Sequence, residues 1–297
     1  MKCLVGIDIE RRCASAIGLL ARLRFPNLET QLLHVEGTLQ LSLPYSAYGM
    51  FVETDQIYET LHAVGEEILA ESQKEAKGLN LDCSTELSEG FPIQSLLDTA
   101  DETGADLIAI TSTARSTLGA VFGGSVARGL AIAGKHSVLV AREAPASEGP
   151  LRAVFATDQS PFCDECIKLL AQWAPKGLSH ITLLTVHEKE KHHGILSRLH
   201  GVDASAAVEQ ADQTLTAKGE ATAKWLTEQG IPAGFKIVDG EIEEAIHHTM
   251  QEDNAELLIV GSQGHGFVER VMVGSTALHE IISEQFPVLL LRPAVAP

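Results

Sequence analysis

The amino-acid sequence predicts an α/β protein made of two tandem open α/β sandwich domains, each with a five-stranded parallel sheet flanked by helices. Two observations predict this fold. Apolar runs of strand length alternate with helix-like segments, a pattern typical of parallel sheets that are buried on both faces. The same series of strands, glycines and charged residues also occurs twice, at a constant offset of 150 residues.

The repeat is read from matching positions in the two halves. Asp8, which closes the first apolar run, corresponds to Asp158 at the end of another apolar run. Three further pairs agree at the same offset: Gly90 with Gly240, residues 105–110 with 255–260, and residues 124–125 with 274–275. Residues 143–150, a polar stretch of Pro, Ala and Gly, suit a linker. We therefore expect one domain over residues 1–147 and a second over 148–297.

The expected elements follow the same plan in both halves. Strands of the first half fall near residues 2–8, 30–36, 82–87, 106–111 and 137–141. Strands of the second half fall near 152–158, 180–186, 234–239, 256–261 and 287–291, with helices near 161–174, 205–230, 241–253 and 275–284. Pro161 suits the first turn of a helix, and Pro287 the first residue of a strand, because neither position needs its N–H group. Ligands of such sheets bind at the carboxyl ends of the strands.

Composition and charge exclude several functions. The chain is 45% hydrophobic and 21% charged, as folded proteins are. Its net charge of −18 and its lack of a basic cluster argue against nucleic acids and against anionic membranes as partners. The sequence shows no membrane-length apolar segment and no signal-peptide pattern, and its five cysteines do not suggest a disulfide scaffold. We expect a cytoplasmic protein.

Residues 261–276, GSQGHGFVERVMVGST, are the stretch that most favours a ligand. Its glycines fall as G-x2-G-x9-G-S directly after the apolar run 257–260. Glycine lets a ligand approach the main chain, and a helix that begins at Ser275 would offer free N–H groups to a phosphate. The stretch is neither a Walker A loop nor the G-x-G-x-x-G loop of dinucleotide sites. A plain glycine-rich turn is the alternative interpretation.

The Asp-ended first strand, this glycine motif and the closing strand from Pro287 to Leu291 resemble the universal stress protein family. The repeat makes the chain similar to tandem, two-domain members. The resemblance implies the strand order 3-2-1-4-5 in each half. It also implies that the two halves pair through their last strands and form an internal pseudo-dimer, with further pairing into a homodimer left open.

Nucleotide-binding members of the family imply an ATP site in the second half. By resemblance, Asp158 would contact the ribose or adenine side, and Val186 would meet adenine with its main chain. The ribose and phosphates would be wrapped by Val260, Gly261, Ser262, Gln263 and Gly264, and the phosphate tail bound by Gly274, Ser275 and Thr276. Mg²⁺ or Mn²⁺ could bridge the phosphates, and its protein ligands are not assigned.

The first half departs from this motif. Thr111 and Ala114 stand where the second half has Gly261 and Gly264. A Cβ atom at either position should crowd a nucleotide and disfavours a positive φ angle. We therefore expect one nucleotide per chain, in the second half, while the first half could bind another small ligand.

Two further groups of residues could take part in redox chemistry or metal binding. Cys163 and Cys166 form a C-x2-C at a helix start, which can lower a thiol pKa, but the acidic residues between them oppose this effect. No second C-x2-C completes a zinc site. Four histidines, at positions 187, 192, 193 and 200, could bind a metal, although a solvated polar loop explains them more simply.

The sequence contains no catalytic constellation, neither a G-x-S-x-G elbow nor an H-E-x-x-H pair. We expect an ATP-binding stress-response regulatory protein that acts through a conformational or partner-binding change, with its protein partner unidentified. The alternatives are a slow Mg-dependent ATPase and a nucleotide-free interaction scaffold. We do not expect a dedicated enzyme, and expect weak ATP hydrolysis at most.

Overall fold

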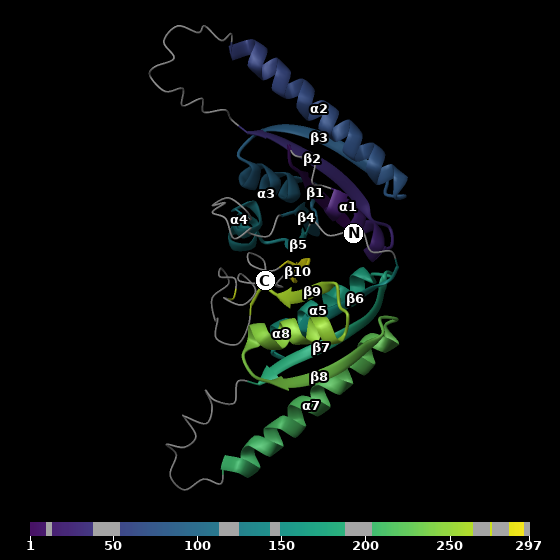
Figure 1. The fold of residues 1–297 in the computed structure, drawn as a ribbon, viewed down its shortest axis with the longest axis vertical. Coiled ribbons are helices and arrows are strands. Elements are labelled where there is room, and N and C mark those ends of the chain that lie inside the picture. The colour runs from purple at the N-terminus through teal and green to yellow at the C-terminus, as the bar shows by residue number, and fades with distance from the viewer. Residues whose placement is uncertain are drawn as a thin grey trace, which may run out of the picture.

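In a computed structural model, one ten-stranded sheet runs through both halves of the chain (Figure 1). The strand order is β3-β2-β1-β4-β5-β10-β9-β6-β7-β8. The structure describes residues 1–9, 14–37, 54–112, 125–142, 149–187, 204–263, 274 and 285–293. The expected domain boundary at residues 147 and 148 lies outside these residues and stays a prediction.

The strands agree with the sequence pattern in both halves. Those of the first half are β1 (Lys2–Ile7), β2 (Glu29–Gly37), β3 (Cys83–Gly90), β4 (Leu107–Thr111) and β5 (Ser137–Ala141). Those of the second half are β6 (Leu151–Ala156), β7 (Leu178–His187), β8 (Ala233–Asp239), β9 (Leu257–Gly261) and β10 (Val288–Leu291). All neighbours within a half pair in parallel. The α/β fold class and the order 3-2-1-4-5 are therefore confirmed.

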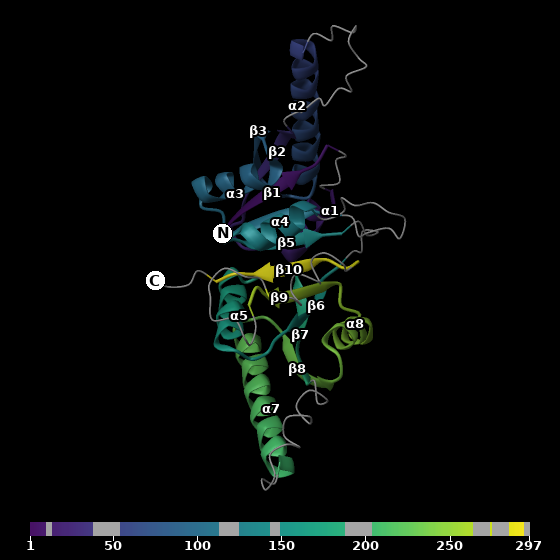
Figure 2. The same ribbon diagram turned by 90° about the vertical axis from the view of Figure 1, so that its left-hand side faces the viewer.

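Helices cover both faces of the sheet (Figures 1 and 2). One layer of buried side chains joins the sheet to α1 (Ala14–Leu23), α2 (Thr54–Gly78), α5 (Pro161–Trp173) and α7 (Ala204–Glu228). A second layer joins its other face to α3 (Pro92–Thr103), α4 (Ser125–Ala133) and α8 (Ile242–Glu252). This double cover explains why the central strands are apolar on both faces. The helix expected near 275–284 lies outside the described residues.

The two halves meet where β5 and β10 pair antiparallel, with Leu139 opposite Leu289 (Figure 2). A second contact joins α1 to the second half. Arg22 forms a bidentate ion pair with Glu256, whose two N–O distances are 3.0 and 2.9 Å. The N–H of Gly177 donates to the carbonyl oxygen of Leu23 at 2.9 Å. The internal pseudo-dimer is therefore confirmed.

The second strands of the two halves differ by one inserted residue. Cys3 pairs with Thr30 in the first half, whereas Ala153 pairs with Ile181 in the second, after a register irregularity at the start of β6. Equivalent positions of β2 and β7 are thus 151 residues apart rather than 150, as 30 and 181 show. His187 at the end of β7 consequently matches Glu36.

Candidate functional site

The carboxyl ends of β6, β7 and β9 lie side by side, because β6 pairs with both of the other strands. This edge collects the described members of the expected site: Asp158, Val186, Val260, Gly261, Ser262 and Gln263. Gly274 is also described. The remaining predicted residues, Gly264, Ser275 and Thr276, lie outside the described residues, so their part in the site stays a prediction.

One hydrogen bond joins the two ends of the glycine motif, and another joins the motif to β10. The N–H of Ser262 donates to the carbonyl oxygen of Leu291 at 3.1 Å, and the N–H of Gly274 donates to the carbonyl oxygen of Ser262 at 2.9 Å. Ser262 is buried. These two N–H groups are therefore already used within the protein. A phosphate would have to find its donors elsewhere in the motif.

Gly261 is a packing position. A Cβ atom there would lie 3.3 Å from the sulfur of Cys166 and 3.3 Å from a ring carbon of Phe162, both on α5. In the first half, the hydroxyl of the equivalent Thr111 accepts a hydrogen bond from the N–H of Ala16 on α1 at 3.2 Å. A side chain at this position meets the covering helix first. Whether a side chain at position 261 or 264 would also crowd a nucleotide stays a prediction.

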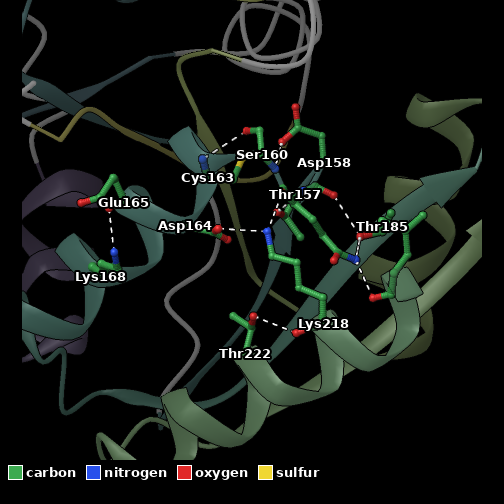
Figure 3. A network of polar contacts seen from close by, with 12 residues as sticks. Thr157, Asp158, Ser160, Cys163, Asp164, Glu165, Lys168, Thr185, Lys218 and Thr222 are labelled. Atoms are coloured by element: carbon green, nitrogen blue, oxygen red, sulfur yellow. Dashed lines mark hydrogen bonds and ion pairs between the residues drawn. The ribbon is translucent and has the colours of Figure 1, made fainter. Parts of the chain in front are cut away.

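Asp158 lies in a tight turn between β6 and α5 (Figure 3). Its carboxylate oxygen Oδ1 accepts a hydrogen bond from the N–H of Ser160 at 2.9 Å. The Ser160 hydroxyl in turn accepts from the N–H of Cys163 at 3.3 Å and caps α5. Between them, Gln159 has a φ angle of 55°, in the left-handed region that residues other than glycine rarely adopt. The backbone beside Asp158 thus has an unusual conformation.

Threonines from two strands hold this turn. The N–H of Gln159 donates to the hydroxyl of Thr157 at 3.0 Å. The side-chain amide of Gln159 donates to the hydroxyl of Thr185 at 3.2 Å and to the carbonyl oxygen of Leu215 on α7 at 3.0 Å. The Thr185 hydroxyl donates to the carbonyl oxygen of Thr157 at 3.0 Å. The turn is therefore connected to β6, β7 and α7.

Lys218 completes the network from α7 (Figure 3). Its ammonium nitrogen Nζ donates to the carbonyl oxygen of Gln159 at 2.6 Å and to the carboxylate of Asp164 at 2.9 Å. Sequence reasoning missed this network. The repeat contained a signal for it, because the first half has isoleucine at the positions of Thr157, Gln159 and Lys218.

The equivalent turn of the first half has different contacts. The isoleucines, Ile7, Ile9 and Ile68, offer no side-chain hydrogen bonds, and Ile9 is 60% exposed. His34, which matches Thr185 in register, places its Nδ1 atom 2.9 Å from the carbonyl oxygen of Ile7. This contact is the counterpart of the hydrogen bond from Thr185 to Thr157 in the second half.

The two cysteines of the C-x2-C are 3% and 0% exposed. Burial, with the Asp158 carboxylate nearby, raises the pKa of Cys163 to about 11. Burial also raises the pKa of Cys166 above its usual range. Such thiols stay protonated near neutral pH and are poor nucleophiles, so the structure does not favour a redox role.

The described part of the chain contains no group of three or more His, Cys, Asp or Glu side chains placed to hold a metal ion. His187 lies 3.1 Å from Asp212, nitrogen to oxygen, while the three other histidines of the proposed cluster lie outside that part. None of the described helices is long and apolar enough to cross a membrane.

Two solved structures are similar to this chain over very different shares of its length. A universal stress protein from Archaeoglobus fulgidus is 19% identical, with a TM-score of 0.68, and the match covers 99% of this chain and 98% of that one. A family member from Arabidopsis thaliana with AMP bound is 14% identical, with a TM-score of 0.35, and the match covers 48% of this chain and 92% of that one. The first likeness shows the shared fold.

Sequence comparisons agree. A universal stress protein of Synechocystis sp. is 28% identical over 142 residues, which are 48% of this chain and 42% of that protein's length. The profile of the universal stress protein family matches this chain twice, over residues 1–142 and again over 151–292. The chain therefore belongs to the universal stress protein family, as a tandem member with two such domains.

Proposed function

We propose that this protein is a stress-response regulator that binds one ATP molecule per chain, at the sheet edge of its second half. One observation carries the choice of that half: the turn bearing Asp158 is held by a polar network, and the turn bearing Asp8 has isoleucines in its place. A site that is ordered before binding loses less conformational freedom when the ligand arrives.

The chemistry of this edge suits a nucleoside. A carboxylate accepts several hydrogen bonds on its two oxygens, so the Asp158 side chain, whose Oδ1 accepts from the N–H of Ser160, suits ribose hydroxyls as further donors. Pairing between β6 and β7 ends at Ala156 and Leu184, while β7 continues to His187 with only β8 beside it. The main chain around Val186 therefore borders the turn and offers alternating donors and acceptors to a base.

The phosphates would lie along the glycine motif. Because the N–H groups of Ser262 and Gly274 are used internally, the donors fall to Gly264, Ser275 and Thr276 in this proposal. A helix beginning at Ser275 would supply two of them. Mg²⁺ or Mn²⁺ would be held chiefly by phosphate oxygens and water, as Mg²⁺ usually is. The AMP of the Arabidopsis thaliana protein belongs to that protein, and its TM-score of 0.35 supports no choice of nucleotide here.

We assign the output to a change of conformation or partner rather than to turnover. The sequence contains neither a G-x-S-x-G elbow nor an H-E-x-x-H pair, which are common catalytic motifs. ATP would act by binding one conformation more tightly than another, since only differential affinity shifts such an equilibrium.

The test starts from the purified full chain. Denaturing it and identifying the released small molecule should yield ATP, and calorimetric titration of the nucleotide-free protein with ATP and Mg²⁺ should give one equivalent. Two equivalents would contradict the assignment to one half. ADP that accumulates with time would favour the slow ATPase, and a titration without heat would favour the scaffold.

A further inference from the structure

We propose that Lys218 is a positioning residue for this nucleotide site: it fixes the left-handed turn at Gln159 and so orients Asp158 toward the ligand. The inference rests on the proposed function. It concerns a residue that lies on α7, a different element from those that carry the glycine motif and Asp158.

The contact is made to the main chain. Lys218 Nζ lies 2.6 Å from the carbonyl oxygen of Gln159, and the hydroxyl of Thr157 lies 3.0 Å from the Gln159 N–H. Side chains thus hold both backbone polar groups of the residue that follows Asp158. A left-handed conformation is disfavoured for glutamine and persists only where its surroundings fix it. Removing the Lys218 side chain would leave the carbonyl group of Gln159 without this hydrogen bond.

A lysine suits this place. Its ammonium group carries three N–H donors and can satisfy a carbonyl and a carboxylate together. Asp164, the carboxylate partner, belongs to the first turn of α5, which Ser160 caps. The next residue, Gly219, packs so closely on the ring of Phe235 that a Cβ atom there would clash with it. The close packing of α7 on β8 therefore fixes the position of the Lys218 main chain, from which its side chain extends to the turn.

The simpler explanation is an ordinary surface ion pair. The side chains of Lys218 and Asp164 are 43% and 35% exposed, and exposed ion pairs contribute little to stability. The same region holds such a pair, because Lys168 lies 2.7 Å from Glu165 on α5 (Figure 3). No hydrogen bond joins that pair to the Asp158 turn among the described contacts. Lys168 is therefore the matched control for Lys218.

The experiment measures ATP affinity of the full chain by calorimetry, with Mg²⁺ present. Lys218→Met should weaken binding about tenfold, the effect of losing one charge-assisted hydrogen bond that acts on the site. Lys168→Met should leave the affinity unchanged. The two methionine variants should have the same denaturation midpoint, so that a difference in affinity does not come from a difference in stability. Lys218→Arg should recover most of the affinity, since a guanidinium can also reach an acceptor pair.

A double-mutant cycle separates positioning from direct contact. If Lys218 acts through Asp158, Lys218→Met should have no further effect in a protein that already carries Asp158→Asn. Additive losses would mean that Lys218 touches the nucleotide itself or loosens the domain, and they would overturn the inference. Wild-type affinity in Lys218→Met would overturn it as well. A wild-type protein that binds no adenine nucleotide would instead refute the proposed function, and the inference with it.

Discussion

The turns after β1 and β6 have the same place in two copies of one fold, yet different chemistry holds them. The second half holds the turn with Thr157, Gln159 and Lys218, while the first half has isoleucines at these three positions and a contact from His34 to Ile7. Both halves form the same strand order and pair in one sheet. The polar network is therefore not required for the fold, and the difference between the halves indicates where a ligand is expected.

A second comparison shows what the halves share. In the first half, Glu36 at the end of β2 lies 3.2 Å from His62 on α2. In the second half, the matching His187 on β7 lies 3.1 Å from Asp212 on α7. The acid and the histidine have exchanged places, but the contact between strand end and long helix remains. Because both halves keep this contact, we attribute it to the stability of the fold rather than to ligand binding.

The largest effect should come from giving the second half the residues of the first. The triple substitution Thr157→Ile, Gln159→Ile and Lys218→Ile removes the network and puts a β-branched residue at a left-handed position. ATP affinity should fall by about a hundredfold or more, since several hydrogen bonds that order the site are lost. Calorimetry gives the affinity, and circular dichroism checks that the fold is kept. Wild-type binding by a folded triple variant would show that the network does not serve the site.

Gly261→Thr separates an effect on packing from an effect on ligand binding, because a Cβ atom at this glycine lies close to α5. The new side chain would meet Phe162 and Cys166, whose nearest atoms lie 3.3 Å from the Cβ position. The free energy of unfolding should fall by about 2 kcal/mol, as in other overpacked cores, while the ATP affinity of the folded protein should stay within about threefold of wild type. Chemical denaturation and calorimetry measure the two. Lost binding without lost stability would show that Gly261 acts in ligand binding rather than in packing.

Much of this fold could be predicted from the sequence because the repeat shows the apolar pattern of each strand twice, once in each half. The strands, their order and the pairing of β5 with β10 came from buried apolar runs and from the family resemblance. The insertion in β7 was missed, since one extra residue leaves the apolar pattern of a buried strand nearly unchanged. Because of this insertion, His187 rather than Val186 has the same place in the sheet as Glu36.

The site was harder to predict than the fold. Asp158 and Val186 could be placed because strand ends meet at one edge of a parallel sheet. The direction of a Cβ atom at Gly261 depends on which face of β9 it lies on, and α5 covers that face. Lys218 is 59 residues from Gln159 in sequence, so only the packing of α7 beside the turn brings them together.

A medium effect is expected from the carboxylates that both halves retain. Asp158→Asn keeps an oxygen that can accept from the N–H of Ser160 but removes the charge offered to the ligand. ATP affinity should fall about tenfold, as for the loss of one hydrogen bond to a charged group. Asp8→Asn is the control and should change neither affinity nor stoichiometry. Equal losses from both substitutions would mean that both halves take part in binding.

The smallest effect concerns His187 and Asp212, the pair in which histidine and acid have exchanged places relative to the first half. His187→Glu alone would set two carboxylates against each other, and Asp212→His alone would set two imidazoles together, so each should lower the free energy of unfolding by about 0.5 kcal/mol. The double variant copies the arrangement of Glu36 and His62 and should recover most of that loss. The pair is partly exposed, with side chains 21% and 34% accessible, so solvent screening keeps these effects small. Denaturation of all four proteins near neutral pH yields the coupling energy. A coupling of zero would mean that the strand-end contact has no energetic role, and the likeness of the two halves at this point would then be one of shape alone.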